Sequence, residues 1–267
     1  MTVIDSHVHP FISRENNFAW YGAPGSLPEF ISDLKRAGVS RACGSVLMKG
    51  EARSFEDVRK LNDAALEIRR RYPDFYIPGV HIHSRYPEES CRELERLHAL
   101  GVKWIGELVP YIMKSGPYDA PGLMDAYALA QQFEMPINIH VYPSPLSEIE
   151  TVAKNFPKLK IVIAHPGEGD EAKARFAFVA KYPNVFLDIS GNGLQRWNML
   201  RYAIGICGSQ KIIFGSDFPI CSAGMLLNGV RAESIDSRDL SRIFSENFMN
   251  LIHEDGFVAE TVYTVLG

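Results

Sequence analysis

The chain begins MTVIDSHVHP, and two histidines one residue apart, His7 and His9, follow the apolar pair Val3 and Ile4. Side chains alternate between the two faces of an extended strand, so both imidazoles point the same way. Two imidazoles on one face can bind a divalent metal ion, although a polar strand end can have the same pattern. The pair therefore predicts two ligands of a metal site if further ligands come from elsewhere in the chain.

Other candidate ligands end other apolar segments of strand length. Glu107 follows WIG, His140 follows INI, His165 follows VIA and Asp217 follows FGS. If these segments are parallel strands of one barrel, their carboxyl ends meet at one rim. Each residue alone is more typical of a hydrogen-bonded strand end or a cap, but their joint placement favours a metal centre. The predicted ligands are His7, His9, Glu107, His140, His165 and Asp217.

Imidazole and carboxylate ligands suit Zn²⁺ or a similar divalent ion and can leave one position for water. The ion lowers the pKa of that water, so that hydroxide is available near neutral pH. A neighbouring carboxylate can accept the proton and pass it to a leaving group. Glu107 could also bridge to a second metal. We therefore expect one or two ions per chain, zinc first, with Mn²⁺ or Fe²⁺ as alternatives.

Eight nearly continuous apolar segments read as strands that are buried on both faces. They span residues 3–9, 40–48, 75–83, 102–109, 136–142, 160–166, 185–191 and 211–219. Helical patterns occupy residues 26–38, 54–73, 87–101, 122–136, 145–157, 170–183 and 237–252. This alternation predicts a single-domain (β/α)8 barrel over residues 1–267, with a doubly wound open sheet as the alternative. No Gly-x-Gly-x-x-Gly pattern follows the first strand, which removes the usual dinucleotide-binding fingerprint.

Composition excludes several classes of protein. A net charge of -4 and the lack of a basic groove disfavour nucleic acid as a partner. No apolar run reaches the roughly 18–20 residues that span a bilayer, and no signal peptide is visible. The four cysteines have no paired spacing, which indicates reduced thiols. We expect a cytoplasmic protein with a small-molecule substrate, and the sequence leaves a homo-oligomer open.

Weaker candidates for substrate binding lie just beyond the strand ends. His81 and His83 form a second His-x-His pair, followed by Arg85. One histidine, taken here as His83, and Arg85 are predicted to hold a substrate carboxylate or phosphate. Further candidates are Tyr111, Tyr142, Asn192 and Arg196, of which Tyr111 and Asn192 are assigned to substrate binding.

Two further features concern the surroundings of this site. Asp5 shares a face with the first two histidines and is expected to orient one of them. The loop over residues 10–25 contains Phe18, Trp20 and Tyr21, and it fits either a lid or substrate wall, or an aromatic loop packed on the rim.

Taken in order, these motifs resemble the amidohydrolase superfamily, in particular its amidohydrolase-2 branch of lactonases, hydratases and decarboxylases of small carboxylic acids. The similar segments are VIDSHVH, INIHVY, VIAHPGEG, IIFGSDFP and the closing SENFMNLI. The resemblance implies a distorted barrel with His7, His9, His140 and Asp217 around the principal metal. It also implies that His165 binds a second metal or the substrate, and that Asp217 shuttles the proton.

One position departs from many members of the superfamily, which place a carboxylated lysine at the end of the fourth strand. Glu107 stands there in this chain, and Lys103 lies four residues earlier. WIGELVPY is similar to the TatD-type nucleases, whereas GSDFP is closer to the amidohydrolase-2 form. Both one and two metals are therefore compatible with this resemblance.

The first functional hypothesis is a hydrolase of a small amide, lactone or ester, in which Asp217 and His165 are catalytic. A metal-dependent decarboxylase or hydratase of a small carboxylic acid is the main alternative, because fold alone does not separate these reactions. A TatD-type phosphoesterase or nuclease comes third. The non-enzyme hypothesis is a barrel that binds a metal or ligand without turnover, and the complete ligand set argues against it.

Overall fold

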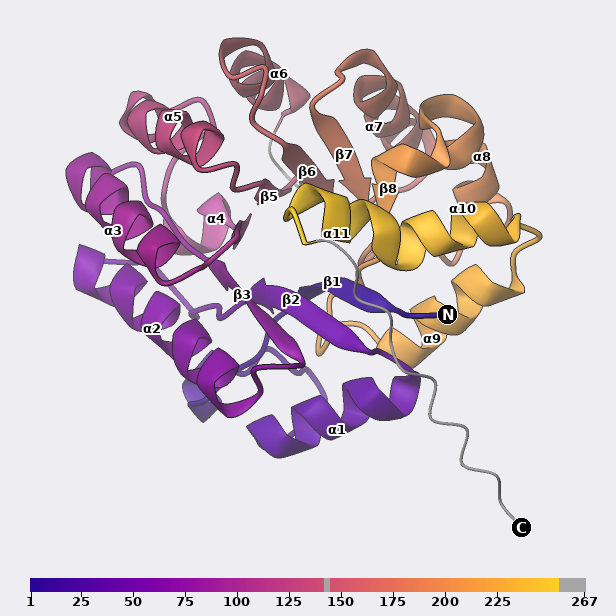
Figure 1. Ribbon diagram of the computed structural model, residues 1–267, viewed down its shortest axis with the longest axis horizontal. Coiled ribbons are helices and arrows are strands. Elements are labelled where there is room, and N and C mark those ends of the chain that lie inside the picture. Colours follow the sequence, from indigo (N-terminus) through magenta and orange to yellow (C-terminus); the bar gives the residue numbers. More distant parts are fainter. Residues whose placement is uncertain (142–144, 255–267) are drawn as a thin grey trace.

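The computed structural model describes residues 1–141 and 145–254 (Figure 1). Within these residues, eight parallel strands form one sheet in the order β1 to β8. The strands are β1 Ile4–Val8, β2 Arg41–Ser45, β3 Tyr76–Val80, β4 Trp104–Leu108, β5 Ile137–His140, β6 Ile161–Ala164, β7 Val185–Asp188 and β8 Ile212–Ile213. Every strand falls inside one of the eight predicted segments, which confirms the predicted strand order.

The last strand segment returns to the first and nearly closes the barrel. The amide of Ser6 donates to the carbonyl of Phe214 at 2.9 Å, and the amide of His9 donates to that of Phe218 at 2.8 Å. In the opposite direction, the amide of Asp217 donates to the carbonyl of His7 at 2.8 Å. The chain is therefore a single-domain (β/α)8 barrel, and its first and last strands bring His7 and Asp217 together.

Helices surround the sheet, as Figure 1 shows. They are α1 Leu27–Ala37, α2 Phe55–Arg71, α3 Pro87–Ala99, α5 Met124–Gln132, α6 Leu146–Asn155, α7 Gly169–Lys181 and α8 Met199–Cys207. After β8 come α9 Ala223–Ala232, α10 Ser237–Ser241, a π-helical turn over Arg242–Glu246, and α11 Asn247–Leu251. Shorter pieces are α4 Pro110–Met113 and the 3-10 turns Arg14–Asn16, Pro121–Leu123 and Ser209–Lys211.

Three helices were not predicted, namely α4, α8 and α9. Helix α4 is only four residues long. Helix α8 lies between Asn198 and Gly208, residue types that are typical of helix ends, but Asn198 has a left-handed φ of 67° and its side chain makes no capping hydrogen bond. The predicted helix over residues 237–252 is divided by its π turn, where the carbonyl of Ile243 accepts from the amide of Phe214 at 2.9 Å. That bond ties the helix to the barrel wall.

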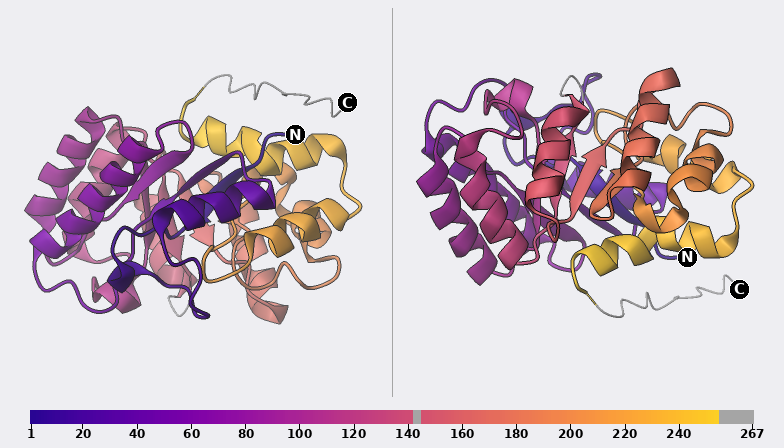
Figure 2. Two further views of the ribbon diagram at one scale, coloured as in Figure 1. Left: turned by 90° about the horizontal axis from the view of Figure 1, so that it is seen from below. Right: turned by 90° about the horizontal axis from the view of Figure 1, so that it is seen from above.

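The amino end of the barrel is closed by α11, which lies on the same side of the molecule as the N-terminus (Figure 2). The ring of Phe248 packs 5.1 Å from that of Trp104, and both side chains are buried with Ile4 and Ile213. Apolar packing therefore fills this end, and the polar strand ends gather at the other. Among the described helices, none is both long enough and apolar enough to cross a membrane.

Candidate metal centre

His7 and His9 project from the carboxyl end of β1, and each ring is held by a partner at its Nδ1 atom. Nδ1 of His7 lies 2.5 Å from a carboxylate oxygen of Asp188, and Nδ1 of His9 lies 3.2 Å from the carbonyl oxygen of Ser45. Both partners only accept hydrogen bonds, so each imidazole carries its proton on Nδ1. The Nε2 lone pairs of both rings are thereby left to face the barrel mouth.

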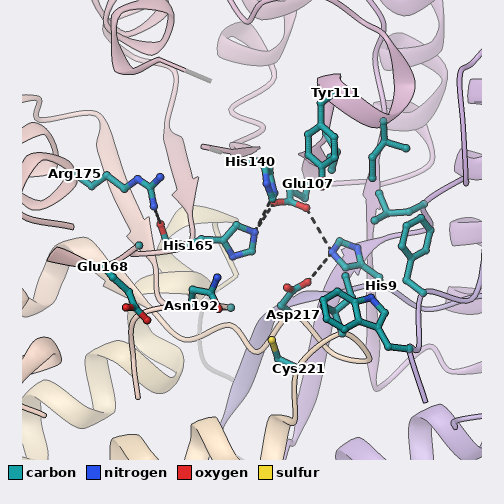
Figure 3. Close-up of a pocket in the computed structure, with 18 of the residues that line it drawn as sticks. His9, Glu107, Tyr111, His140, His165, Glu168, Arg175, Asn192, Asp217 and Cys221 are labelled. Atoms are coloured by element: carbon teal, nitrogen blue, oxygen red, sulfur yellow. Dashed lines mark hydrogen bonds and ion pairs between the residues drawn. The ribbon is translucent and has the colours of Figure 1, made fainter. Parts of the chain in front are cut away.

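These two lone pairs converge with a carboxylate. The Nε2 atoms of His7 and His9 are 3.1 Å apart, and Oδ1 of Asp217 lies 3.7 Å from that of His7. The same Oδ1 atom lies 3.3 Å from Nε2 of His9 (Figure 3). Two acceptor nitrogens and an anionic oxygen repel one another unless a cation lies among them. The donor set therefore fits a divalent ion bound by imidazole and carboxylate.

Glu107, at the end of β4, faces both halves of the site. Its Oε2 atom lies 3.4 Å from Nε2 of His7 and 3.5 Å from Nε2 of His9. Its Oε1 atom lies 2.9 Å from Nδ1 of His140 and 3.3 Å from Nε2 of His165. Two three-residue donor groups result, His7 with His9 and Asp217, and His7 with Glu107 and His165, and within each group the donor atoms lie within 4.8 Å of one another. Because His7 belongs to both groups, the geometry fits either one metal ion or a pair of ions.

Burial and charge oppose each other in this cluster. Burial would lower the pKa of His7, but the carboxylates of Glu107 and Asp188 outweigh it and hold that pKa well above its ordinary value. Burial would likewise raise the pKa of Glu107, but His7 and His140 outweigh it and hold that pKa well below its ordinary value. The buried carboxylates thus require positive charge beside them, which a proton supplies when no metal is bound.

His165 and Asp217 both adopt a left-handed backbone conformation, with φ of 66° each. Such conformations are uncommon for residues other than glycine and concentrate at functional sites. Around His165 the packing is tight, because a Cβ atom on Gly191 would lie 2.5 Å from its Nδ1 atom. That Nδ1 atom lies 3.2 Å from the carbonyl oxygen of Ser190, which directs Nε2 toward Glu107.

A cavity of about 700 Å³ opens above these donors. Its lining includes the aromatic side chains Phe18, Trp20 and Tyr111, and the ring of Tyr111 lies 5.2 Å from that of His140. Its polar lining includes Glu171 and also Glu168, Arg175 and Asn192, which lie across the site from Tyr111 (Figure 3). The loop after β1 therefore forms a wall of the cavity, as one of its two interpretations predicted.

Residues 4–247 match the amidohydrolase family, in the amidohydrolase-2 form. The chain belongs to the amidohydrolase family. This membership agrees with the ordered strand-end residues from which the resemblance was inferred. No curated protein matches the chain in sequence.

Several solved structures share the fold of this chain at low sequence identity. The 2,6-dihydroxybenzoate decarboxylase from Rhizobium is 18% identical, with a TM-score of 0.74 over 96% of this chain and 99% of its own. The 5-carboxyvanillate decarboxylase from Sphingomonas paucimobilis is 16% identical, with a TM-score of 0.73 over 95% and 99%. A third, 5-carboxyvanillate decarboxylase from Novosphingobium aromaticivorans, contains manganese and 4-hydroxy-3-methoxy-5-nitrobenzoic acid; it is 15% identical, with a TM-score of 0.72 over 94% and 96%. At these identities the similarity bears on the fold.

The structure brings all six predicted ligands together, and Tyr111 and Asn192 line the cavity above them. His83 and Arg85 are placed elsewhere. The His83 ring is buried against the carbonyl of Met113, with Nε2 at 3.1 Å, and Arg85 binds Glu51 and the carbonyl of Ala52, each at 2.7 Å. Neither lines the cavity, because Met113 holds the His83 ring in the interior and Glu51 and Ala52 hold the Arg85 side chain near the surface.

The remaining candidates have mixed positions. Asp5 accepts from the amides of His7 at 3.3 Å and Ser216 at 2.8 Å, so it fixes backbone rather than an imidazole. Lys103 lies near Glu254 at the opposite end of the barrel. Arg196 lines a second, smaller hollow beside the cavity. Tyr142 lies outside the described residues.

Two residues that support the site were not identified from the sequence. Asp188 ends β7 and holds His7, and the rule that found the other strand-end residues also applies to it. Arg175 lies on α7, is 3% exposed, and donates from Nη1 to the carbonyl of His165 at 2.8 Å. No sequence signal distinguishes Arg175 from a surface helical arginine, because its burial depends on how α7 packs.

Proposed function

We propose that this protein is a divalent-metal enzyme that removes CO₂ from a small carboxylic acid without an oxidant. The observation that carries the proposal is the lining of the cavity, in which the metal donors occur together with the aromatic side chains Phe18, Trp20 and Tyr111. We call these three side chains the aromatic wall. Such a cavity suits a flat apolar body with a carboxylate at one end. The decarboxylases of similar fold, one with bound manganese and an aromatic acid, support the same choice.

The ligands would divide as the two donor groups do. His7, His9 and Asp217 would hold the principal ion. Glu107 and His165, with His7 shared and His140 beside Glu107, would hold a second ion or the substrate. When bound, the ion would supply a Lewis acid for an anionic substrate oxygen. Manganese and zinc both suit this mixed donor set, so we retain zinc as the first expectation and manganese as its rival.

Side chains of the protein would supply the proton that decarboxylation requires. In decarboxylation the bond between the substrate carbon and its carboxyl group breaks, the electron pair stays on that carbon, and the carbon takes up one proton as CO₂ leaves. Asp217 would deliver this proton, since its Oδ1 atom faces the imidazoles and the residue lines the cavity. His165 would stabilise negative charge, because Glu107 raises the pKa of this ring despite the opposing effect of burial. Asp217 would then recover its proton from water.

Hydrolysis of a small amide, lactone or ester is the second candidate. It is favoured by the placement of Asp217 beside the metal donors, where the carboxylate could accept a proton from water and return it to the leaving group. A hydratase would use the same groups. A TatD-type phosphoesterase or a barrel that only binds its ligand would need neither the aromatic wall nor the complete proton-transfer set.

The broader expectations remain part of the proposal. We propose that the protein works in the cytoplasm on a free small molecule, with neither membrane nor nucleic acid as a partner. The whole of residues 1–267 would serve this one activity, and the oligomeric state is left to be measured.

The test begins with metal content, measured on protein purified without chelators or a histidine tag. We expect close to one or two equivalents of zinc, manganese or iron. The loaded enzyme is then given aromatic acids, lactones, amides and phosphoesters, and CO₂ and hydrolysis products are measured. CO₂ release supports decarboxylation, whereas hydrolysis without CO₂ release transfers the assignment to the second candidate.

Variants connect that activity to the site. His7→Ala and Asp217→Ala should lose metal, turnover or both, because each removes a donor of the first group. Asp33→Ala is the matched control, since Asp33 lies on α1 and pairs with the exposed Arg36. Full metal content and turnover in both site variants would overturn the assignment.

A further inference from the structure

A second hollow of about 250 Å³ lies directly beside the active-site cavity. The two share Gly167 and Glu168, which follow β6 and lead into α7. The lining of the second hollow comes from α7, from the segment that leads into α8 and from α8 itself, and it includes Phe176, Trp197 and Tyr202. Its position places it within reach of a ligand that extends out of the first cavity.

Three aromatic side chains, Phe176, Trp197 and Tyr202, contribute to the lining of this hollow. Trp197 is 83% exposed, and the guanidinium of Arg201 lies 5.1 Å from the centre of its ring. The rings of Phe176 and Tyr202 are 6.2 Å apart, and Tyr202 is 44% exposed. Solvent-exposed aromatic rings around a hollow offer flat apolar contact area that is otherwise unfavourable in water.

An ion pair joins Glu168, which borders both hollows, to Arg196, which lines the second. Nη2 of Arg196 donates to Oε2 of Glu168 at 2.5 Å, and Nε2 of Gln195 donates to Oε1 of the same carboxylate at 2.9 Å. The side chains of Arg196 and Glu168 are 65% and 40% exposed. An exposed pair of this kind contributes little to stability, so a ligand can displace or lie across it at low cost.

We propose that the second hollow is an outer subsite for a further planar apolar ring of the substrate whose carboxylate lies at the metal donors. This inference rests on the proposed function and narrows its substrate class to acids with two rings. Size supports it, because a cavity of about 150 Å³ already binds benzene. Continuity supports it too, because Gly167 and Glu168 border both hollows.

The protein contains a reporter for each hollow. Of its three tryptophans, Trp20 lines the first cavity, Trp197 lines the second, and Trp104 is fully buried. In Trp20→Phe the exposed fluorescence therefore comes from Trp197, and in Trp197→Phe it comes from Trp20. The probes are a nitrobenzoate and a nitrobiphenyl carboxylate, since nitroaromatic rings quench a neighbouring indole.

We expect the two-ring acid to quench Trp197 in the Trp20→Phe protein and the one-ring acid to leave Trp197 largely unquenched. Removing the outer contact by Trp197→Ala should weaken binding of the two-ring acid about tenfold relative to the one-ring acid. Met225→Ala is the matched control, because Met225 is also strongly exposed, at 78%, but lines neither hollow. In this control the ratio of the two dissociation constants should stay as in the unaltered protein.

Turnover separates this inference from the proposed function. If one-ring acids lose CO₂ and a second ring changes neither affinity nor Trp197 fluorescence, the outer subsite is wrong while the function stands. If the two-ring acid quenches Trp197 and depends on it, but no acid loses CO₂, the subsite stands and the decarboxylase proposal fails. Equal weakening of both acids by Trp197→Ala would also overturn the subsite, because the contact would then not be specific to the second ring.

Discussion

Asp188 holds His7 by a short hydrogen bond, with 2.5 Å between the carboxylate oxygen and Nδ1, and both side chains are almost fully buried. The amide of Ser190 donates to the other oxygen of Asp188 at 2.8 Å, so the carboxylate is itself fixed. A carboxylate behind a metal-binding imidazole selects its tautomer and raises its basicity. Asp188 therefore orients His7, which belongs to both donor groups.

Asp188→Asn should weaken metal binding by roughly 10- to 100-fold, because the amide keeps the shape but holds the imidazole less strongly. The measurement is a competition titration against a chelator of known affinity. Asp33→Asn serves as the control for an aspartate outside the site. Unchanged metal affinity in Asp188→Asn would show that the hydrogen bond has no part in ligand orientation.

Metal affinity should rise with pH across the neutral range. The proton and the metal compete for Nε2 of His7, and the carboxylates of Glu107 and Asp188 hold the pKa of this ring well above its ordinary value despite burial. Protonated His7 is thus present below that raised pKa and is lost above it, so acid weakens binding. Titrations with Zn²⁺ at about pH 6, 7 and 8 should give progressively tighter binding with proton release. An affinity that is independent of pH would contradict this competition.

Arg175 should act as a positioning residue for His165. Its Nη1 donates to the carbonyl of His165 at 2.8 Å, and its Nη2 donates to Glu171 at 2.5 Å. Arg175→Met should lower kcat by about 10- to 100-fold while metal content is retained, because the imidazole moves away from its productive position. Arg175→Lys should recover only part of that loss, since an ammonium lacks the planar fork.

The control for Arg175 is Arg36→Met, a change at a side chain that is 74% exposed. Thermal unfolding should be recorded for each protein, so that a general loss of fold is distinguished from misplacement of His165. A drop in melting temperature with normal kcat in Arg175→Met would assign the residue to stability alone.

Tyr118 secures the backbone beneath His140. Its hydroxyl lies 2.8 Å from the carbonyl oxygen of Leu108 and 2.7 Å from that of His140, and the side chain is 2% exposed. Tyr118→Phe leaves these carbonyls without that donor, so the free energy of unfolding should fall by about 1–3 kcal/mol. Urea unfolding measures the change, with Tyr21→Phe as the control because Tyr21 is 95% exposed. Equal stability of the two variants would argue against this role.

Strand-end chemistry could be predicted because it follows from chain order. Parallel strands place their carboxyl ends at one rim, so His7, Glu107 and Asp217 had to converge once the eight segments were recognised. Some helix boundaries could also be predicted from their capping residues. Ser26 caps α1 by accepting from the amide of Glu29, and Gly38 ends that helix with φ of 98°. Helix α8 was not predicted although Gly208 follows it, and in the structure it packs against α7.

The sequence by itself determined the barrel and the six residues that meet at its mouth, because alternation and periodicity are local properties of the chain. The family was indicated separately, by the resemblance of its ordered motifs. Only the tertiary structure decided which atoms face one another. It placed Asp188 behind His7, turned Glu107 toward both donor groups, buried Arg175 against His165, and held His83 and Arg85 away from the cavity. Each of these outcomes depends on rotamers and on distances between segments far apart in the chain, which spacing along the sequence does not encode.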